Sequence, residues 1–200
     1  KWRVVTIHQD IYGSGLDHSD TDGMILRTQL TPLFDQYNVD VVLQGHDHTY
    51  SRSKLLYSDG QTHDNYEFQM LADGSDYDWD HAFDLTTQSQ ITLAPQDDTE
   101  KNGLEAFQKD NHCYTIENTD GNTVVNPKGI LYMTANSASG SKYYELIASQ
   151  QDYIAKRAQN WLPSYSVIDM TADHFAITTY QITDQNQIEQ MDEPFTIVKE

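Results

Sequence analysis

Two apolar runs with a helical repeat between them mark the beginning of the chain. Residues 2–8 (WRVVTIH) are rich in Val, Ile and Thr, and residues 39–43 form a second apolar run, so both are predicted to be buried strands. Within 22–37, apolar residues recur at spacings of three and four, which predicts a helix with a kink or a break at Pro32. The order strand, helix, strand predicts a βαβ unit with parallel strands and a right-handed crossover.

Strand-like and helix-like patterns return in the last third of the chain. Residues 145–160 carry their apolar side chains on one side of a helical repeat, which predicts a second long helix. A hairpin turn is expected near Asp173. Four further runs have strand character: 130–135 (ILYMTA), 164–170, 174–183 and 195–199.

A long polar stretch separates these two patterned regions. Residues 66–129 are acidic and poor in apolar runs, and the segments DGSDYDWDH and APQDDTEKNG have the composition of exposed loops. A short helix is expected near 103–109. We predict a single, partial domain over residues 1–200, with an acidic, loop-rich insertion or lid at about 55–127.

Composition excludes several classes of protein. Hydrophobic residues make up 38% of the chain and aromatic residues 11%, which indicates a globular protein, and no apolar run has the length of a membrane span. The net charge of −19 argues against binding to the phosphate backbone of a nucleic acid. The single cysteine, Cys113, excludes an intrachain disulfide and a sulfur-rich zinc site.

Three histidines follow the two predicted parallel strands. His8 ends the first strand, and the sequence VVLQGHDHTY places His46 and His48 directly after the second. Because ligands of parallel sheets sit outside the carboxyl ends of the strands, we expect these histidines at one edge. Imidazole nitrogens bind transition metals, and Gly45 permits a sharp turn before the pair, so the pattern favours a metal site. The alternative is a chance pair of ordinary surface or core histidines.

The combination of these motifs resembles the calcineurin-like metallophosphoesterases, and among them the purple acid phosphatase branch. The resemblance rests on GHDHTY after a buried strand, on the upstream strand that ends in His8, and on PLFDQYNVD between them. GILYMTANSASGSKYY and the segment from PSYSVIDMTADHFAITTYQI to FTIVK are also similar to that branch. The resemblance covers most of the chain except about 55–127. It implies a mixed α/β fold, namely the C-terminal half of a four-layer α/β/β/α sandwich with one βαβ unit followed by largely antiparallel strands.

The resemblance also implies a chemistry, which is the hydrolysis of a small-molecule phosphate ester at a dinuclear centre of Fe, Mn or Zn ions. Carried over by position, His8 and His46 would ligate one metal and His48 the other. His18 would contact the phosphate and protonate the leaving group, as an imidazole can near neutral pH. Arg52 would contact phosphate as well, or else pair with a surface carboxylate.

The chain also departs from the family pattern. Asp10 stands where the family typically has a proline, and the family's Asp-x-His, Gly-Asp and Asn-His elements belong upstream of His8, where this chain has few residues. We therefore expect a fragment of a metallophosphoesterase that is inactive and poor in metal on its own, and that self-associates through exposed sheet edges and apolar faces. A non-enzymatic binding or structural domain with relic or single-metal histidines is the alternative. A bacterial exported or cell-surface protein is the expected setting.

The remaining histidines lie in polar segments or at the start of a strand, and we expect them at the surface. They are His63, His81, His112 and His174. Asp47, between the two motif histidines, is expected to have a structural role beside the metal ligands.

Overall fold

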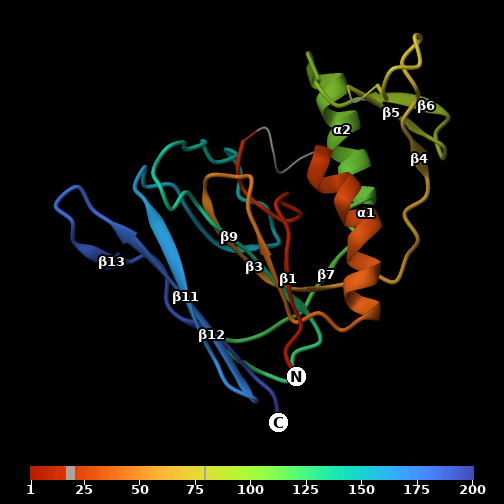
Figure 1. Ribbon diagram of the computed structural model, residues 1–200. Coiled ribbons are helices and arrows are strands. Elements are labelled where there is room, and N and C mark those ends of the chain that lie inside the picture. Colours follow the sequence, from red (N-terminus) through yellow and green to blue (C-terminus); the bar gives the residue numbers. More distant parts are fainter. Residues whose placement is uncertain (17–20, 79) are drawn as a thin grey trace.

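The computed structural model describes residues 1–16, 21–78 and 80–200, and three β-sheets and two helices are formed within these ranges (Figure 1). The first sheet has the strand order β1-β2-β9-β3-β10, with β7 paired to β3. Its strands are β1 (Val4–Thr6), β2 (Val41–Gln44), β9 (Ile130–Ala135), β3 (Tyr50–Tyr57), β10 (Ile154–Ala158) and β7 (Thr115–Ile116).

The predicted βαβ unit is confirmed at the beginning of this sheet. β1 pairs with β2 in parallel, β2 pairs with β9 in parallel, and helix α1 (Thr21–Gln36) connects β1 to β2. Val41 and Val42 are both 0% exposed and belong to different apolar clusters, because neighbouring side chains of a strand point to opposite faces. The sheet is therefore covered on both faces, as parallel strands usually are.

Helix α1 continues through Pro32 as one helix, so the prediction of a break is wrong. The proline lies on the exposed side. Met24, Arg27, Thr31 and Phe34 are buried at spacings of three and four, so the packed face holds the helix together while Pro32 costs one backbone hydrogen bond on the solvent side.

The second sheet has the order β11-β12-β14-β8, with β13 paired to β12. The predicted hairpin is confirmed, since β11 and β12 pair antiparallel from Ser164↔Gln181 to Met170↔Phe175. Its side chains pack against the first sheet in a cluster that includes Phe175 and Ile197. The strands are β11 (Ser164–Met170), β12 (His174–Ile182), β13 (Ile188–Gln190), β14 (Phe195–Val198) and β8 (Thr123–Val125).

The helix predicted over 145–160 is absent, and this prediction is wrong. Most of this segment has no regular structure, and Ile154–Ala158 forms strand β10 on the edge of β3. Tyr153 and Ile154 are buried against the sheet, and the amide of Lys54 donates to the carbonyl of Tyr153 at 2.8 Å. Pairing with β3 provides hydrogen-bond partners for the backbone of this segment. A short apolar pattern in the sequence does not distinguish a helix from a strand.

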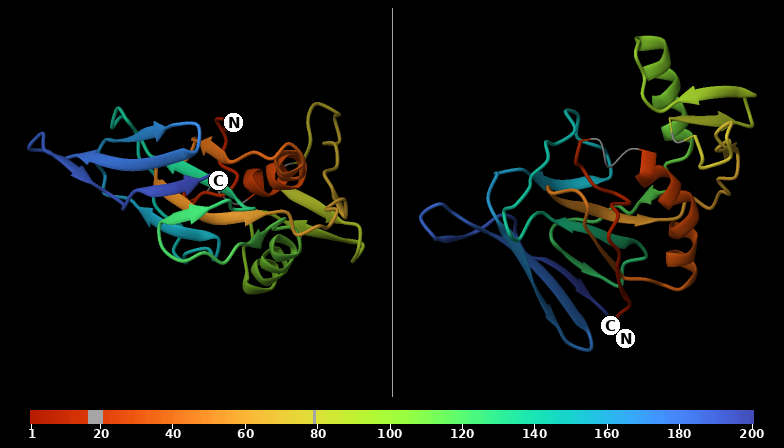
Figure 2. Two further views of the ribbon diagram at one scale, coloured as in Figure 1. Left: turned by 90° about the horizontal axis from the view of Figure 1, so that it is seen from below. Right: turned by 45° about the horizontal axis from the view of Figure 1, so that its top comes forward.

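The first part of the polar region, residues 66–110, forms a lobe beside α1, whereas β7 and β8 at the end of that region belong to the first and second sheets. Strands β4 (Tyr66–Glu67), β5 (His81–Asp84) and β6 (Ser89–Thr92) make a small antiparallel sheet, and α2 (Asp98–Asp110) packs beside β6. Figure 2 shows this lobe and the second sheet at opposite ends of the molecule. The predicted helix at 103–109 is confirmed and is longer. Within the described residues, neither helix has the length and apolar character needed to cross a membrane.

Candidate functional site

The histidines that follow β1 and β2 meet at the carboxyl edge of the first sheet. Nε2 of His8 lies 3.3 Å from Nδ1 of His46, and the two rings contact edge to face. The parallel pairing of β1 with β2 brings them together, and the amide of Gly45 donates to the carbonyl of His8 at 3.1 Å. A Cβ on residue 45 would lie only 3.2 Å from that carbonyl oxygen, so glycine permits this approach.

The backbone at His46 is strained. Its φ is +66°, in the left-handed region that residues other than glycine rarely adopt. The amide of Asp47 donates to the carbonyl of Gly45 at 2.8 Å, which makes His46 the central residue of a γ-turn of the rare, positive-φ kind. Strain of this sort clusters at functional sites, where the surrounding structure holds it in place.

The separation of the two histidine nitrogens is that of a hydrogen bond between the rings, and it also lies in the range for two ligands of one metal ion. Two imidazole nitrogens bound to one ion at about 2.1 Å lie roughly 3.0–3.4 Å apart when the angle at the metal is about 90–110°. The separation of 3.3 Å between His8 and His46 falls in this range. Within residues 1–16, 21–78 and 80–200, however, no three His, Cys, Asp or Glu side chains come close enough together to hold one ion.

His48 is oriented separately from this pair. Its Nδ1 lies 2.8 Å from the carbonyl oxygen of Lys142, to which it donates when it carries the proton, and its ring packs against Tyr144. A hydrogen bond of this kind from one ring nitrogen fixes the tautomer and leaves Nε2 as the nitrogen that can bind a metal. The structure thus brings the side chains of His8 and His46 together. It holds His48, two residues after His46, through separate contacts with the carbonyl of Lys142 and the ring of Tyr144.

Two carboxyl groups are buried next to the histidine turn. Asp10 and Asp47 are each 1% exposed. Oδ1 of Asp10 accepts a hydrogen bond from Thr134 at 2.7 Å, and Oδ2 of Asp47 accepts one from the amide of Gly15 at 2.7 Å. Burial, and then the nearby Asp47 carboxylate, raise the pKa of Asp10 well above its usual range. These contacts tie the loop after β1 to the edge of the sheet and to the turn that carries His46 and His48.

Arg52 is paired with a buried carboxylate. Its Nε is 2.8 Å from Oδ2 of Asp192, both side chains are almost fully buried, and its guanidinium lies over the ring of Phe195. Tyr50 donates to the same carboxylate oxygen at 2.8 Å. Arg52 therefore pairs with a buried carboxylate between the two sheets and not with a surface carboxylate. The two residues are 140 positions apart in the sequence. His18 lies outside the described residues.

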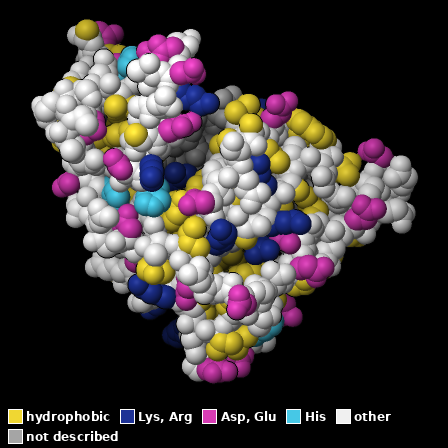
Figure 3. All heavy atoms as spheres, turned by 180° about the vertical axis from the view of Figure 1, so that it is seen from behind, with side chains coloured by type: hydrophobic (Ala, Val, Ile, Leu, Met, Phe, Trp, Pro, Cys, Tyr) yellow, Lys and Arg dark blue, Asp and Glu magenta, His cyan; other side chains and the backbone are white. Residues whose placement is uncertain are grey.

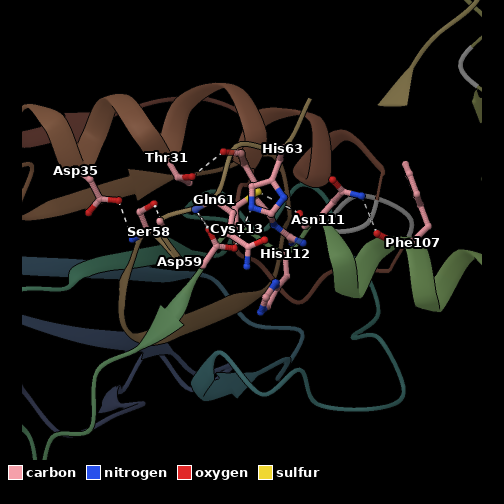
Figure 4. Close-up of polar contacts among 12 residues, drawn as sticks. Thr31, Asp35, Ser58, Asp59, Gln61, His63, Phe107, Asn111, His112 and Cys113 are labelled. Atoms are coloured by element: carbon pink, nitrogen blue, oxygen red, sulfur yellow. Dashed lines mark hydrogen bonds and ion pairs between the residues drawn. The ribbon is translucent and has the colours of Figure 1, made fainter. Parts of the chain in front are cut away.

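Two histidines expected at the surface are part of a buried polar cluster. Nε2 of His63 lies 2.9 Å from Oδ2 of Asp59, and their side chains are only 7% and 9% exposed. Figure 4 shows this pair gathered beside α1 with His112 and Cys113. The i, i+4 spacing of Asp59 and His63 was the only signal of this pair in the sequence, and it does not reveal burial.

Burial also alters the groups next to this pair. It lowers the pKa of His112, whose ring packs against Tyr114 at 4.2 Å between centroids. Burial raises the pKa of the Cys113 thiol to about 12, and the thiol donates to the carbonyl of Asn111. Cys113 is therefore a protonated, unreactive thiol at neutral pH.

Comparison with known proteins supports the fold implied by these features. The structure of purple acid phosphatase PPD1 from yellow lupin (Lupinus luteus) seeds superposes on 100% of this chain and 25% of that chain, with a TM-score of 0.53 and 11% sequence identity. The chain has a metallophosphoesterase-like fold. The prediction of a mixed α/β fold of this kind is confirmed. At 11% identity the likeness concerns the fold alone.

Sequence comparison matches a smaller part of the chain than the structural superposition does. Two uncharacterized proteins of Mycobacterium tuberculosis, MT2654 and Rv2577, are each 44% identical to it over 55 residues, or 28% of this chain. The matched part is 10% of the length of either relative. No family model matches the chain. The metallophosphoesterase-like fold therefore rests on the architecture, and the chain spans only a small part of the proteins it resembles.

Proposed function

We propose that this chain is part of a metal-dependent phosphoesterase that hydrolyses a small-molecule phosphate ester. The observation that carries the proposal is the distance of 3.3 Å between Nε2 of His8 and Nδ1 of His46 at the carboxyl edge of a metallophosphoesterase-like sheet. His8 and His46 would hold one metal and His48 a second, and the ions would be Fe, Mn or Zn. When bound, such metals lower the pKa of a water molecule and stabilise charge on the attacking and leaving oxygens.

The chain's own residues would orient these ligands. The γ-turn at His46 directs its imidazole toward His8, and the carbonyl of Lys142 holds His48 in the tautomer whose Nε2 is free of the proton. The carboxylate of Asp47 fixes the loop after β1 through the amide of Gly15. His18 remains the proposed general acid because of its place in the family motif.

The test measures hydrolysis of p-nitrophenyl phosphate by the full-length protein before and after treatment with a chelator. Chelation and the substitution His46→Ala are each expected to lower kcat/KM by about 100-fold or more, because a catalytic metal contributes several kcal/mol to transition-state stabilisation. His81→Ala, in the distant small sheet, serves as the matched control and leaves activity unchanged. Undiminished activity in metal-free protein would overturn the proposal.

A second candidate is a binding domain in which the histidines hold one structural metal or none. It is favoured by the finding that the described residues contain no group of three metal-binding side chains. Elemental analysis and activity of the full-length protein distinguish the two candidates. About two equivalents of transition metal together with turnover support the phosphoesterase, whereas one equivalent or none without turnover supports the binding domain.

A further inference from the structure

A cleft of about 800 Å³ separates the helix α2 from the segment that precedes β10. One wall is formed by α2 and the loop before it, and the other by residues 147–153. Arg27 of α1 and Tyr114, the residue before β7, also line it. Figure 3 shows the molecule hollowed between the lobe of the insertion and the remainder, with Lys and Arg side chains around the hollow. The volume is that of a small-molecule site.

The walls of the cleft are largely apolar and partly aromatic. Leu93 and Leu104 line it from the side of the insertion, and Ile147 lines it from the opposite side. Tyr114 and Tyr153 pack against one another with ring centroids 5.6 Å apart, and both line the cleft. Tyr114 and Tyr153 are only 9% and 4% exposed, so the apolar surface open to a ligand comes mainly from residues such as Leu93 and Ile147, which favours a ligand with an apolar body.

The charge of the cleft is opposite to that of the molecule. Among the described residues, its lining contains three of the chain's 12 Lys and Arg residues (Arg27, Lys101 and Lys109) but only two of its 31 Asp and Glu residues. One of those two, Asp152, accepts a hydrogen bond from Tyr114. Lys101 lies 4.0 Å from Glu105, and Arg27 is buried and donates to the carbonyl of Ile11. The lining still has one more positive than negative side chain in a protein with a net charge of −19, which favours an anionic ligand.

The cleft is connected to the histidine turn through the loop after β1. Leu16 and Ile147 line one end of it. The amide of Leu16 donates to the carbonyl of Glu145 at 2.8 Å, and the amide of Ile147 donates to the carbonyl of Ser14 at 2.9 Å. The same loop is bound at Gly15 to Asp47. One continuous hydrogen-bonded segment thus connects the wall of the cleft to the turn that carries His46 and His48.

We propose that this cleft binds an anionic group with an apolar body, which packs on Leu93 and Ile147 while its negative charge faces the lysines of α2. Its role in the reaction rests on the proposed function: the group bound here is the organic part of the phosphate ester, and the phosphate lies at the histidine edge. The preferred substrate is then a phosphate ester whose organic part is bulky, apolar and negatively charged. Small aliphatic phosphate esters would leave the cleft empty and bind more weakly.

Binding of naphthalene-1-sulfonate to the full-length protein in EDTA tests the cleft without a metal centre or a phosphate. We expect saturable binding by calorimetry, with inorganic phosphate failing to compete. The double substitution Lys101→Gln/Lys109→Gln is expected to weaken binding by about tenfold, since two positive charges near the ligand are removed. Lys54→Gln/Lys156→Gln is the matched control, because it removes the same charge from exposed positions on the first sheet and leaves binding unchanged.

Absence of binding at millimolar ligand, or equal weakening in both double variants, would overturn the proposal. These outcomes leave the proposed function untouched, because metal-dependent hydrolysis of p-nitrophenyl phosphate is measured separately. In the loaded enzyme, Lys101→Gln/Lys109→Gln is expected to raise KM for 5-sulfo-1-naphthyl phosphate about tenfold with little change for phosphoserine. Binding of naphthalene-1-sulfonate without hydrolysis of any phosphate ester would support the cleft and contradict the phosphoesterase.

Discussion

At the scale of single residues, the close approach of Gly15 to Asp47 controls how the loop after β1 meets the histidine turn. The amide of Gly15 donates to the Asp47 carboxylate at 2.7 Å, and a Cβ at this position would lie 2.4 Å from the Asp47 carboxyl carbon. That distance is far inside van der Waals contact. The glycine is therefore required by packing and not by an unusual backbone angle.

Gly15→Ala is expected to lower the free energy of unfolding by about 1–3 kcal/mol, because the new methyl group overpacks a buried contact. Urea denaturation measures the change. The matched control is Gly103→Ala in α2, where nothing lies within 4 Å of the added Cβ and where stability should rise by roughly 0.5–1 kcal/mol. Equal stability of the two variants would contradict the close packing of Gly15 on Asp47.

His112 gives the stability of the protein a dependence on pH. Because burial lowers its pKa below the value of about 6.5 in an unfolded chain, the unfolded state binds more protons between these two values. Stability therefore rises with pH in this window and is lost as the pH falls below about 6.5. His112→Gln is expected to reduce this slope, which urea midpoints between pH 5 and pH 8 would measure. Parallel pH profiles of the two proteins would refute the assignment.

At the scale of elements, both helices show how local signals are modified by packing. α1 tolerates Pro32 because its opposite face is buried. α2 is capped by Asp97, the residue before it, whose side chain accepts hydrogen bonds from the amides of Thr99 and Glu100. The apolar pattern of 145–160 gave the wrong element because β3 offered an edge to which β10 could pair. Pairing at a sheet edge depends on a strand that is distant in the sequence, so the local pattern of apolar residues does not predict it.

Pro32→Ala is expected to raise the free energy of unfolding by about 1 kcal/mol or more, because it restores a backbone donor in the interior of a helix. Thermal unfolding followed by circular dichroism measures the effect. Leu33→Ala, at the neighbouring exposed position, is the control and is expected to change stability by no more than about 0.5 kcal/mol. A loss of stability in Pro32→Ala would show that the ring makes contacts that outweigh the missing hydrogen bond.

Asp97→Ala is expected to destabilise the lobe by about 1 kcal/mol, since it removes the acceptor for two amides at the start of α2. Asp97→Asn retains a capping oxygen and is expected to stay close to the parent protein. Hydrogen exchange of the α2 amides distinguishes local loosening of the lobe from global unfolding. Equal exchange in all three proteins would argue that the cap contributes nothing to α2.

At the scale of the whole molecule, the two sheets present open edges and apolar surface. β11 ends the second sheet in the described part of the chain, and Val167, Ile168 and Met170 on it are 49%, 40% and 54% exposed. β1 ends the first sheet in the same way. Unpaired strand edges beside exposed apolar side chains favour association with a further strand or chain.

The isolated chain of 200 residues is therefore expected to self-associate at micromolar concentration. Ile168→Lys/Met170→Lys should shift it toward the monomer, because charged residues on an edge strand oppose pairing. Light scattering coupled to size-exclusion chromatography measures the mass. Leu33→Lys, on the exposed side of α1, is the control and leaves association unchanged. A monomer at every concentration would contradict this prediction.

The sequence by itself determined the βαβ unit, the terminal hairpin and the proximity of His8 to His46. Each depends on the spacing of apolar residues and on the order of strands that are close together in the sequence. Only the tertiary structure decided that 154–158 is a strand, that Arg52 pairs with Asp192, and that the side chains of His63 and Asp59 are buried. It also decided that α2 and residues 147–153 enclose a cleft. These outcomes depend on side chains brought together from distant positions, and desolvation and packing at such contacts leave no periodic trace in the chain.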